Sequence, residues 1–210
     1  MNMNLKPLAD QVGLNESVLK ERKEYLGLTP EEEEELAQFR DAVAAMAPSV
    51  VDEFYTKLEQ APEFRALVND ADTIERMHAA MRAYLTTLFS GQYDMSYACD
   101  RLRLGKLHFR IGVSESLLIA SLARLKEMID ERLLGTGLIA RIPEAVSKVF
   151  LFDLQLIIDA YVQGYVRRVD QARWEARHNR SPAHAMVAES TPVRRALRRD
   201  DREAPPSSQA

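Results

Sequence analysis

One histidine of this sequence lies on the apolar side of a predicted helix. His108 stands between Leu104, one helical turn before it, and Ile111, about one turn after it. Residues at these spacings share a helix face, so the imidazole faces an apolar surface rather than water. Such a ring either packs as a neutral core group bonded to a backbone carbonyl, or ligates a metal through one nitrogen while an acceptor holds the other.

The surroundings of His108 in the sequence narrow the kind of metal site. No second histidine, cysteine or carboxylate accompanies it at a spacing typical of zinc ligands, which argues against a site built from protein ligands alone. A haem needs only one protein ligand, because the porphyrin supplies four others. A lone histidine in an apolar wall therefore favours haem.

The composition predicts that His108 is carried by an all-α protein. The 210 residues are 46% hydrophobic and include only 8 glycines. Long stretches rich in Ala, Leu, Glu, Arg and Met lie between the prolines, and these residues lose little rotamer freedom in a helix. The length and the apolar content suffice for one substantial domain.

Start and stop signals divide the chain into helices. Thr29, Pro30 and Glu32 supply an N-cap, a first-turn proline and a capping-box acid for a helix that is predicted to reach about Met46. Pro48 is expected to start the next helix. The other predicted helices cover about residues 16–25, 64–68, 73–90, 97–111, 114–134 and 143–174. Thr73 and Ser114 are expected to cap the helices that begin there, and Gly112 is expected to end the helix over 97–111.

Cysteine content and hydropathy favour a cytoplasmic location. The single Cys99 cannot form an intramolecular disulfide, and the first residues lack the apolar core of a secretory signal. The most apolar stretch, 149–162, is interrupted by Asp153 and Asp159 and is shorter than the roughly 20 residues of a membrane-spanning helix. No membrane span is predicted.

Charge is distributed unevenly along the chain. The net charge is -4, yet arginine is concentrated between residues 167 and 202. An acidic body disfavours nucleic acid as a partner, although a basic tail supports weak, salt-sensitive contacts. Beyond about Arg177 the sequence is rich in Pro, Ser, Ala and Arg without apolar periodicity, so a disordered tail is expected.

Three segments, in order, resemble the globin-coupled sensor family. They are Tyr25-Leu-Gly-Leu-Thr29, Glu53-Phe-Tyr55 and Arg103-Leu-Gly-Lys-Leu-His108-Phe-Arg-Ile-Gly112. The resemblance covers about residues 20–165 and implies a globin fold with haem b, a proximal histidine at His108 and a distal tyrosine at Tyr55. The expected divisions are a helical N-terminal extension over 1–28, a globin sensor domain over 29–177 and the tail over 178–210.

The resemblance also implies a distal pocket. Dioxygen gains negative charge when iron donates electron density to it, so the Tyr55 hydroxyl would stabilise it more than CO. The alternative is that Tyr55 is a core aromatic residue beside Phe54. Met77 and Ala80 match distal positions of the family, but some relatives have a hydroxyl residue where this chain has Ala80. The predicted haem-contacting residues are Phe54, Tyr55, Met77, Ala80, Leu104, His108 and Ile111, with His108 as the metal ligand.

Two positions near this pocket stay open. The family commonly has an aromatic pair where this sequence has Leu117 and Leu118, so the group that holds the second nitrogen of His108 is not identified. His78 points about 100 degrees away from Met77 around the helix, so it is either a surface residue or a contact of a haem propionate.

The predicted function is detection of O2, CO or NO, most favourably O2, by a homodimer. The resemblance implies that the last two long helices form the dimer interface, and a separate signalling protein is a further expected partner. The chain contains no output module, so it is not expected to be an enzyme, although derivation from a longer protein remains open. The alternatives are a haem enzyme, such as an NO dioxygenase or a peroxidase, and a haem-free scaffold, which retention of His108 and Tyr55 disfavours. The apolar residues expected at the interface are Leu118, Leu122, Leu125, Val149, Phe152, Leu156 and Tyr161.

Overall fold

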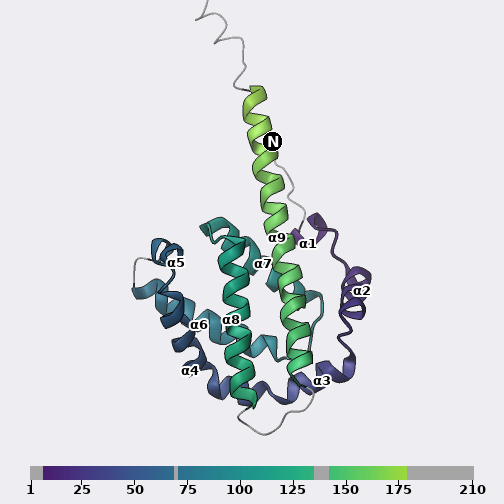
Figure 1. Ribbon diagram of the computed structural model, residues 1–210. Coiled ribbons are helices and arrows are strands. Elements are labelled where there is room, and N and C mark those ends of the chain that lie inside the picture. Colours follow the sequence, from purple (N-terminus) through teal and green to yellow (C-terminus); the bar gives the residue numbers. More distant parts are fainter. Residues whose placement is uncertain (1–6, 69–70, 135–141, 179–210) are drawn as a thin grey trace, which may run out of the picture. The chain divides into compact units, whose positions relative to one another are not determined.

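Helices form all the regular structure in the described part of the chain. The computed structural model describes residues 7–68, 71–134 and 142–178, and no strand occurs in these ranges, so the all-α prediction is confirmed. The helices (Figure 1) are α1 (Leu8–Gln11), α2 (Glu16–Leu26), α3 (Pro30–Gln38), α4 (Arg40–Leu58), α5 (Pro62–Leu67), α6 (Ala71–Leu88), α7 (Met95–Ile111), α8 (Glu115–Leu134) and α9 (Ile142–His178).

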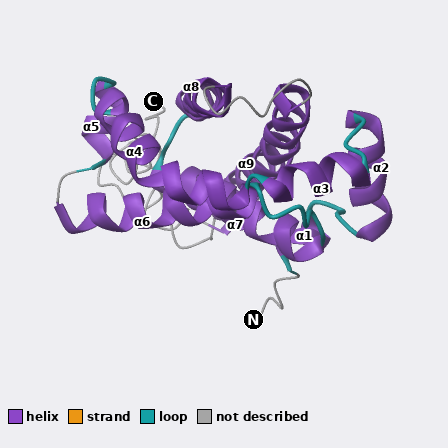
Figure 2. Ribbon diagram, turned by 90° about the horizontal axis from the view of Figure 1, so that it is seen from below, coloured by secondary structure: helices purple, strands orange, loops and turns teal. Residues whose placement is uncertain are grey.

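The chain divides into two units, residues 1–165 and 166–210. The described part of the second unit is the last segment of α9, up to His178. The predicted disordered tail otherwise lies outside the described residues. In the first unit, α4, α5 and α6 lie on one side of α8, and α2 and α3 lie beyond α9 on the other side (Figures 1 and 2).

The start of α3 follows the local signals, but its end does not. Thr29 Oγ1 accepts a hydrogen bond from the Glu32 amide at 3.3 Å, and the Glu32 carboxylate accepts one from the Thr29 amide at 3.1 Å, which is the predicted capping box. The predicted continuation to Met46 is wrong, because α3 ends at Gln38. The Phe39 amide turns to the Leu36 carbonyl at 3.1 Å, and both side chains are buried there.

Pro48 lies inside α4 instead of starting a helix, so that prediction is wrong as well. Proline lacks an N–H donor, and its place in a helix interior costs about 3 kcal/mol. Val50 and Val51 in the next turn are fully buried, and each such burial contributes about 1.5–3 kcal/mol. Packing of α4 into the core therefore outweighs the local cost of the proline.

Caps fix both ends of α7. Asp94 accepts a hydrogen bond from the Tyr97 amide at 2.9 Å, an N-cap that the sequence analysis missed. At the other end Gly112 adopts the left-handed conformation, with φ of +87°, as its predicted role as a helix stop requires.

Ser114 then caps α8 as predicted, because its hydroxyl accepts from the Leu117 amide at 3.1 Å. Thr73, the predicted cap of α6, lies inside that helix.

Glycine allows α7 to approach α9 closely. A Cβ atom on Gly105 would lie 2.6 Å from the Ile157 carbonyl oxygen and 2.9 Å from the Ala160 Cβ. Neither neighbour is the flexible end of a long side chain, so any larger residue would push the two helices apart. Gly105 therefore sets the spacing of the helix that carries His108.

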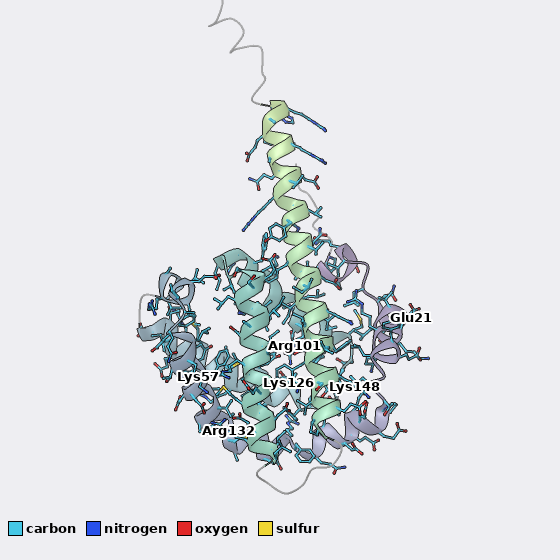
Figure 3. The ribbon with its side chains drawn as sticks, viewed as in Figure 1. Glu21, Lys57, Arg101, Lys126, Arg132 and Lys148 are labelled. Atoms are coloured by element: carbon cyan, nitrogen blue, oxygen red, sulfur yellow. The ribbon has the colours of Figure 1, made fainter. Side chains whose placement is uncertain are left out.

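A buried ion pair also joins α7 to α9. Arg101 Nε donates to Asp153 Oδ2 at 2.7 Å, and both side chains are buried (Arg101 is labelled in Figure 3). The Tyr97 hydroxyl donates to the other oxygen of Asp153, and Arg101 Nη2 donates to Thr87 Oγ1 of α6 at 3.0 Å. The guanidinium also lies over the rings of Tyr84 and Tyr97, at 4.5 and 4.2 Å from their centroids. This network connects α6, α7 and α9.

The N-terminal helices join the same core. Leu14, Leu19 and Leu28 are buried in the hydrophobic cluster that also contains residues of α4 and α9. Lys148 of α9 donates to the Gly27 carbonyl at 2.9 Å and forms an ion pair with Glu32 at 2.6 Å (Lys148 is labelled in Figure 3). The segment predicted as an extension is thus packed against the segment predicted as the globin domain.

None of the helices in the described ranges has a stretch long and apolar enough to cross a membrane.

Asp153→Ala is expected to lower the free energy of unfolding by about 3–5 kcal/mol, because Arg101 would be left buried without its counter-ion. Urea denaturation followed by circular dichroism measures this change. Asp159→Ala on the same helix is the matched control, since the ion pair of Asp159 with Arg22 is partly exposed and contributes less than about 1 kcal/mol. Equal losses in the two variants would contradict the structural role of the buried pair.

Candidate functional site

An apolar cavity of about 680 Å³ lies within the first unit. Helices α4, α5, α6, α7 and α8 and one residue of α9 line it. This volume is in the range of natural ligand-binding pockets, which are commonly apolar with a few polar groups. All seven residues that the sequence analysis assigned to haem contact are among its lining side chains: Phe54, Tyr55, Met77, Ala80, Leu104, His108 and Ile111.

His108 is held by its own helix. Its Nδ1 lies 2.9 Å from the Leu104 carbonyl oxygen, one turn earlier in α7. Only a donor can pair with a carbonyl, so Nδ1 carries the proton and Nε2, in the neutral ring, keeps a free lone pair. Burial lowers the pKa of His108 below its ordinary value of 6.5, so the ring is neutral near pH 7. The Leu104 carbonyl is thus the group that holds the second nitrogen of His108, which the sequence did not identify.

Hydrogen bonds with two other helices hold the end of α7. The Tyr161 hydroxyl of α9 donates to the Val113 carbonyl at 3.0 Å. The amide and hydroxyl of Ser114 donate to the Glu63 carboxylate of α5 at 2.8 and 3.0 Å. The turn between α7 and α8 is thus fixed, and the His108 ring lies one turn before it.

Tyr55 lies in the same cavity with its hydroxyl already engaged. The ring is buried, and the hydroxyl donates to the Met77 carbonyl oxygen at 3.2 Å. Burial raises the pKa of Tyr55 to about 12, so the phenol keeps its proton at neutral pH and can act as a donor. Phe54 packs edge-on against this ring at 5.3 Å between centroids.

His78 has a place that the sequence analysis did not foresee. Its ring stacks on the Tyr55 ring, with centroids 4.5 Å apart and planes 12° apart. Its Nδ1 lies 3.2 Å from Asp52 Oδ1 of α4. His78 is not among the side chains that line the cavity. The sequence could not show this contact, because it depends on how α4 and α6 cross.

Two arginines at the cavity were also missed. Arg76 of α6 and Arg110 of α7 are exposed residues that contribute to its lining. Arg76 Nη2 also donates to Thr73 Oγ1 at 3.0 Å. An apolar cavity with guanidinium groups suits an apolar molecule that carries carboxylates.

The residues predicted to form an apolar outer face on α8 and α9 do not do so. Leu122 is partly buried and lines the cavity, and the other six are buried: Leu118, Leu125, Val149, Phe152, Leu156 and Tyr161. The prediction of these residues as an interface is wrong, because the sequence shows an apolar stripe but not what covers it. Exposed apolar side chains on the first unit's part of these helices are Ile119, Leu134, Leu151, Val162 and Tyr165.

Comparison with known proteins assigns this chain to a family. The family model described as Protoglobin matches residues 15–167. The chain belongs to the protoglobin family. This membership confirms the sequence-based resemblance to globin-coupled sensors and the predicted cofactor, haem b.

Individual relatives agree with this family assignment. The protoglobin chain is 28% identical over 176 residues to a protein of Halobacterium salinarum described as the heme-based aerotactic transducer HemAT. The match covers 77% of this chain but 36% of the relative, so the chain spans about a third of that protein's length. In structure it is similar to the globin domain of a Geobacter sulfurreducens globin-coupled sensor, with a TM-score of 0.64 and 19% identity over 68% of this chain and 96% of that one.

The His108→Leu substitution is expected to remove one acid-dependent loss of stability in the haem-free protoglobin. Since burial lowers the pKa of His108, the unfolded chain takes up this proton at a higher pH than the folded chain. The stability that neutral His108 contributes is complete above pH 6.5 and is lost as the pH falls through the lowered pKa. The parent should therefore lose more unfolding free energy than the variant between about pH 7 and pH 5 in urea titrations.

His178→Leu is the matched control for this experiment. His178 makes the same kind of hydrogen bond, from Nδ1 to the Trp174 carbonyl at 2.8 Å, but on an exposed helix segment. The unfolding free energy of this variant should change with pH as that of the parent does. An identical pH response of the His108 variant and the parent would contradict the neutral state of the partly buried His108.

Proposed function

We propose that this protoglobin binds haem b in the cavity, with His108 as the ligand of the iron, and detects O2 or another diatomic gas there. The observation that carries the proposal is a neutral imidazole on an apolar cavity of about 680 Å³, with Nδ1 held by the Leu104 carbonyl and Nε2 left with its lone pair. Haem, when bound, supplies an iron centre that takes up small gas molecules reversibly.

The residues of the cavity fit this cofactor. The lining is mostly aliphatic and aromatic, as a porphyrin face requires, and His108 is the only His, Cys, Asp or Glu among the lining residues. A hydrogen-bonded second nitrogen is the usual support of a metal-ligating histidine. Arg76 and Arg110 provide positive charge for the carboxylates of the propionates.

Tyr55 is suited to distinguish gases. Its protonated hydroxyl now bonds to the Met77 carbonyl and can turn to a ligand that carries partial negative charge. A hydrogen bond of this kind contributes about 0.5–1.5 kcal/mol net, and more toward a charged acceptor. Such a donor favours O2 over CO. Met77 adds polarizable bulk at the same place and limits access to the cavity.

The comparisons support sensing over the two alternatives. The relatives are described as an aerotactic transducer and a globin-coupled sensor, which are signalling proteins, and this agrees with the prediction that the chain is not an enzyme. A haem-free scaffold would fill its pocket with side chains, whereas this cavity has room for a large ligand. Location in the cytoplasm is part of the proposal.

A homodimer formed through α8 and α9 would carry the signal. The exposed residues Leu151 and Val162 lie three turns apart on one stripe of α9, and Ile119 and Leu134 lie on α8. These two helices also reach the cavity with residues on their inner faces, such as Leu118 and Ile157. A change of packing in the cavity can thus alter the outer faces of the same helices.

His108→Ala is expected to weaken haem binding by more than the roughly 10- to 100-fold that follows loss of a supporting partner, because the coordinating nitrogen itself is removed. Absorption spectra after haem reconstitution should lose the Soret band of the parent, and added imidazole should restore it. His178→Ala serves as the control and should bind haem as the parent does. A Soret band that persists unchanged in His108→Ala would overturn the ligand assignment.

Ile119→Glu combined with Leu151→Glu is expected to convert a dimer into a monomer, because two charges would be buried in each copy of the interface. Sedimentation equilibrium at micromolar concentration measures the mass. Lys20→Glu, an exposed change on α2, should leave the dimer intact. A monomeric parent chain at this concentration would refute the dimer proposal.

A further inference from the structure

We propose that Asp52 and His78 form a positioning pair that orients Tyr55 and thereby sets how long the site retains O2. The inference rests on the proposed function of the cavity, but its structural part concerns only side chains of this chain. His78 is a positioning residue, because it touches Tyr55 and does not line the cavity.

The stack between the two rings restrains the face of Tyr55. The centroids lie 4.5 Å apart, and the planes differ by only 12°, so the imidazole covers the phenol ring almost in parallel. Phe54 meets the ring edge-on at 5.3 Å, and Phe64 lies tilted at 6.1 Å. The Tyr55 ring is thus packed against aromatic groups from α4, α5 and α6.

Asp52 fixes the ring of His78 in turn. Its Oδ1 lies 3.2 Å from His78 Nδ1, and it stands about one turn before Tyr55 in α4. The same helix therefore holds both the tyrosine and the anchor of the ring that stacks on it. The His78 side chain is 21% exposed and that of Asp52 is 69% exposed, so the pair lies near the protein surface, outside the cavity lining.

Adjacent residues of α6 hold both ends of Tyr55. The carbonyl of Met77 accepts the hydroxyl at 3.2 Å, while the ring of His78 covers the aromatic face. A restrained ring can redirect its hydroxyl hydrogen by rotation about the C–O bond, without moving the ring. A donor fixed in this way costs little reorganisation when a ligand arrives. If the ring were free, the entropy lost on fixing it would reduce the net free energy that the hydrogen bond contributes to ligand binding.

The test compares variants of the haem-loaded full chain by the rates at which O2 and CO dissociate. His78→Leu removes the stack and the anchor, and O2 should leave about two- to tenfold faster, the range for weakening one ordinary hydrogen bond. CO dissociation should stay unchanged. His78→Phe keeps an aromatic stack, so its O2 dissociation rate should return most of the way to that of the parent. Asp52→Ala releases His78 and should speed O2 dissociation, as His78→Leu does.

A double-variant cycle separates positioning from a general effect on the fold. If His78 acts through Tyr55, His78→Leu should change O2 dissociation in the parent but not in a Tyr55→Phe background. The proposal is overturned if His78→Leu leaves O2 dissociation unchanged, or if it has the same effect in both backgrounds.

A second readout keeps this inference distinct from the proposed function. In the chain as purified, NMR of ¹³C-labelled tyrosine rings, with Tyr55 assigned by its loss in Tyr55→Phe, should show faster ring flips in His78→Leu than in the parent. Unchanged flips would overturn the positioning role even if haem binds. Faster flips in a chain that does not bind haem would support the pair and refute the proposed function alone.

Discussion

The buried ion pair between Arg101 and Asp153 is the constraint on which the geometry of the site depends. Two charges without access to water are tolerated only when their hydrogen bonds are satisfied, and Tyr97 and Thr87 satisfy them here. These bonds are directional, so α7 cannot rotate or slide against α9 without breaking them. His108 lies two turns after Arg101 on α7, and its position on the cavity wall therefore follows from this pair.

Backbone carbonyls hold both polar side chains that face the cavity. The Leu104 carbonyl fixes the proton of His108 on Nδ1, and the Met77 carbonyl takes the hydroxyl of Tyr55. Burial then acts on the two groups in different ways, since it keeps the imidazole neutral and the phenol protonated. One wall of the cavity thus offers a lone pair, and the side chain of Tyr55 offers a proton donor.

The proposed signal depends on helices that line the cavity with one face and expose the other face to solvent. Leu118 and Leu125 of α8 line the cavity, whereas Ile119 of the same helix is exposed. A ligand can shift a protein between arrangements only if it binds them with different free energies. Some side chains of α8 and α9 contact both the cavity and the core. Through these side chains, ligand binding would favour one arrangement of the outer faces.

The sequence by itself determined the features that local interactions control. The capping box of Thr29 and Glu32, the stop at Gly112 and the apolar setting of His108 each depend on residues within about one helical turn, so they were predicted correctly. The resemblance to a known family named seven residues for haem contact, and all seven line one cavity, while their contact with haem stays a prediction.

Only the tertiary structure decided the features that depend on packing between helices. These are the break at Phe39, the helical place of Pro48, the faces of α8 and α9 that are covered, and the stack of His78 on Tyr55. Each depends on partners far away along the chain. Periodicity shows that a helix has an apolar side, but the free energy of burying that side depends on what packs against it.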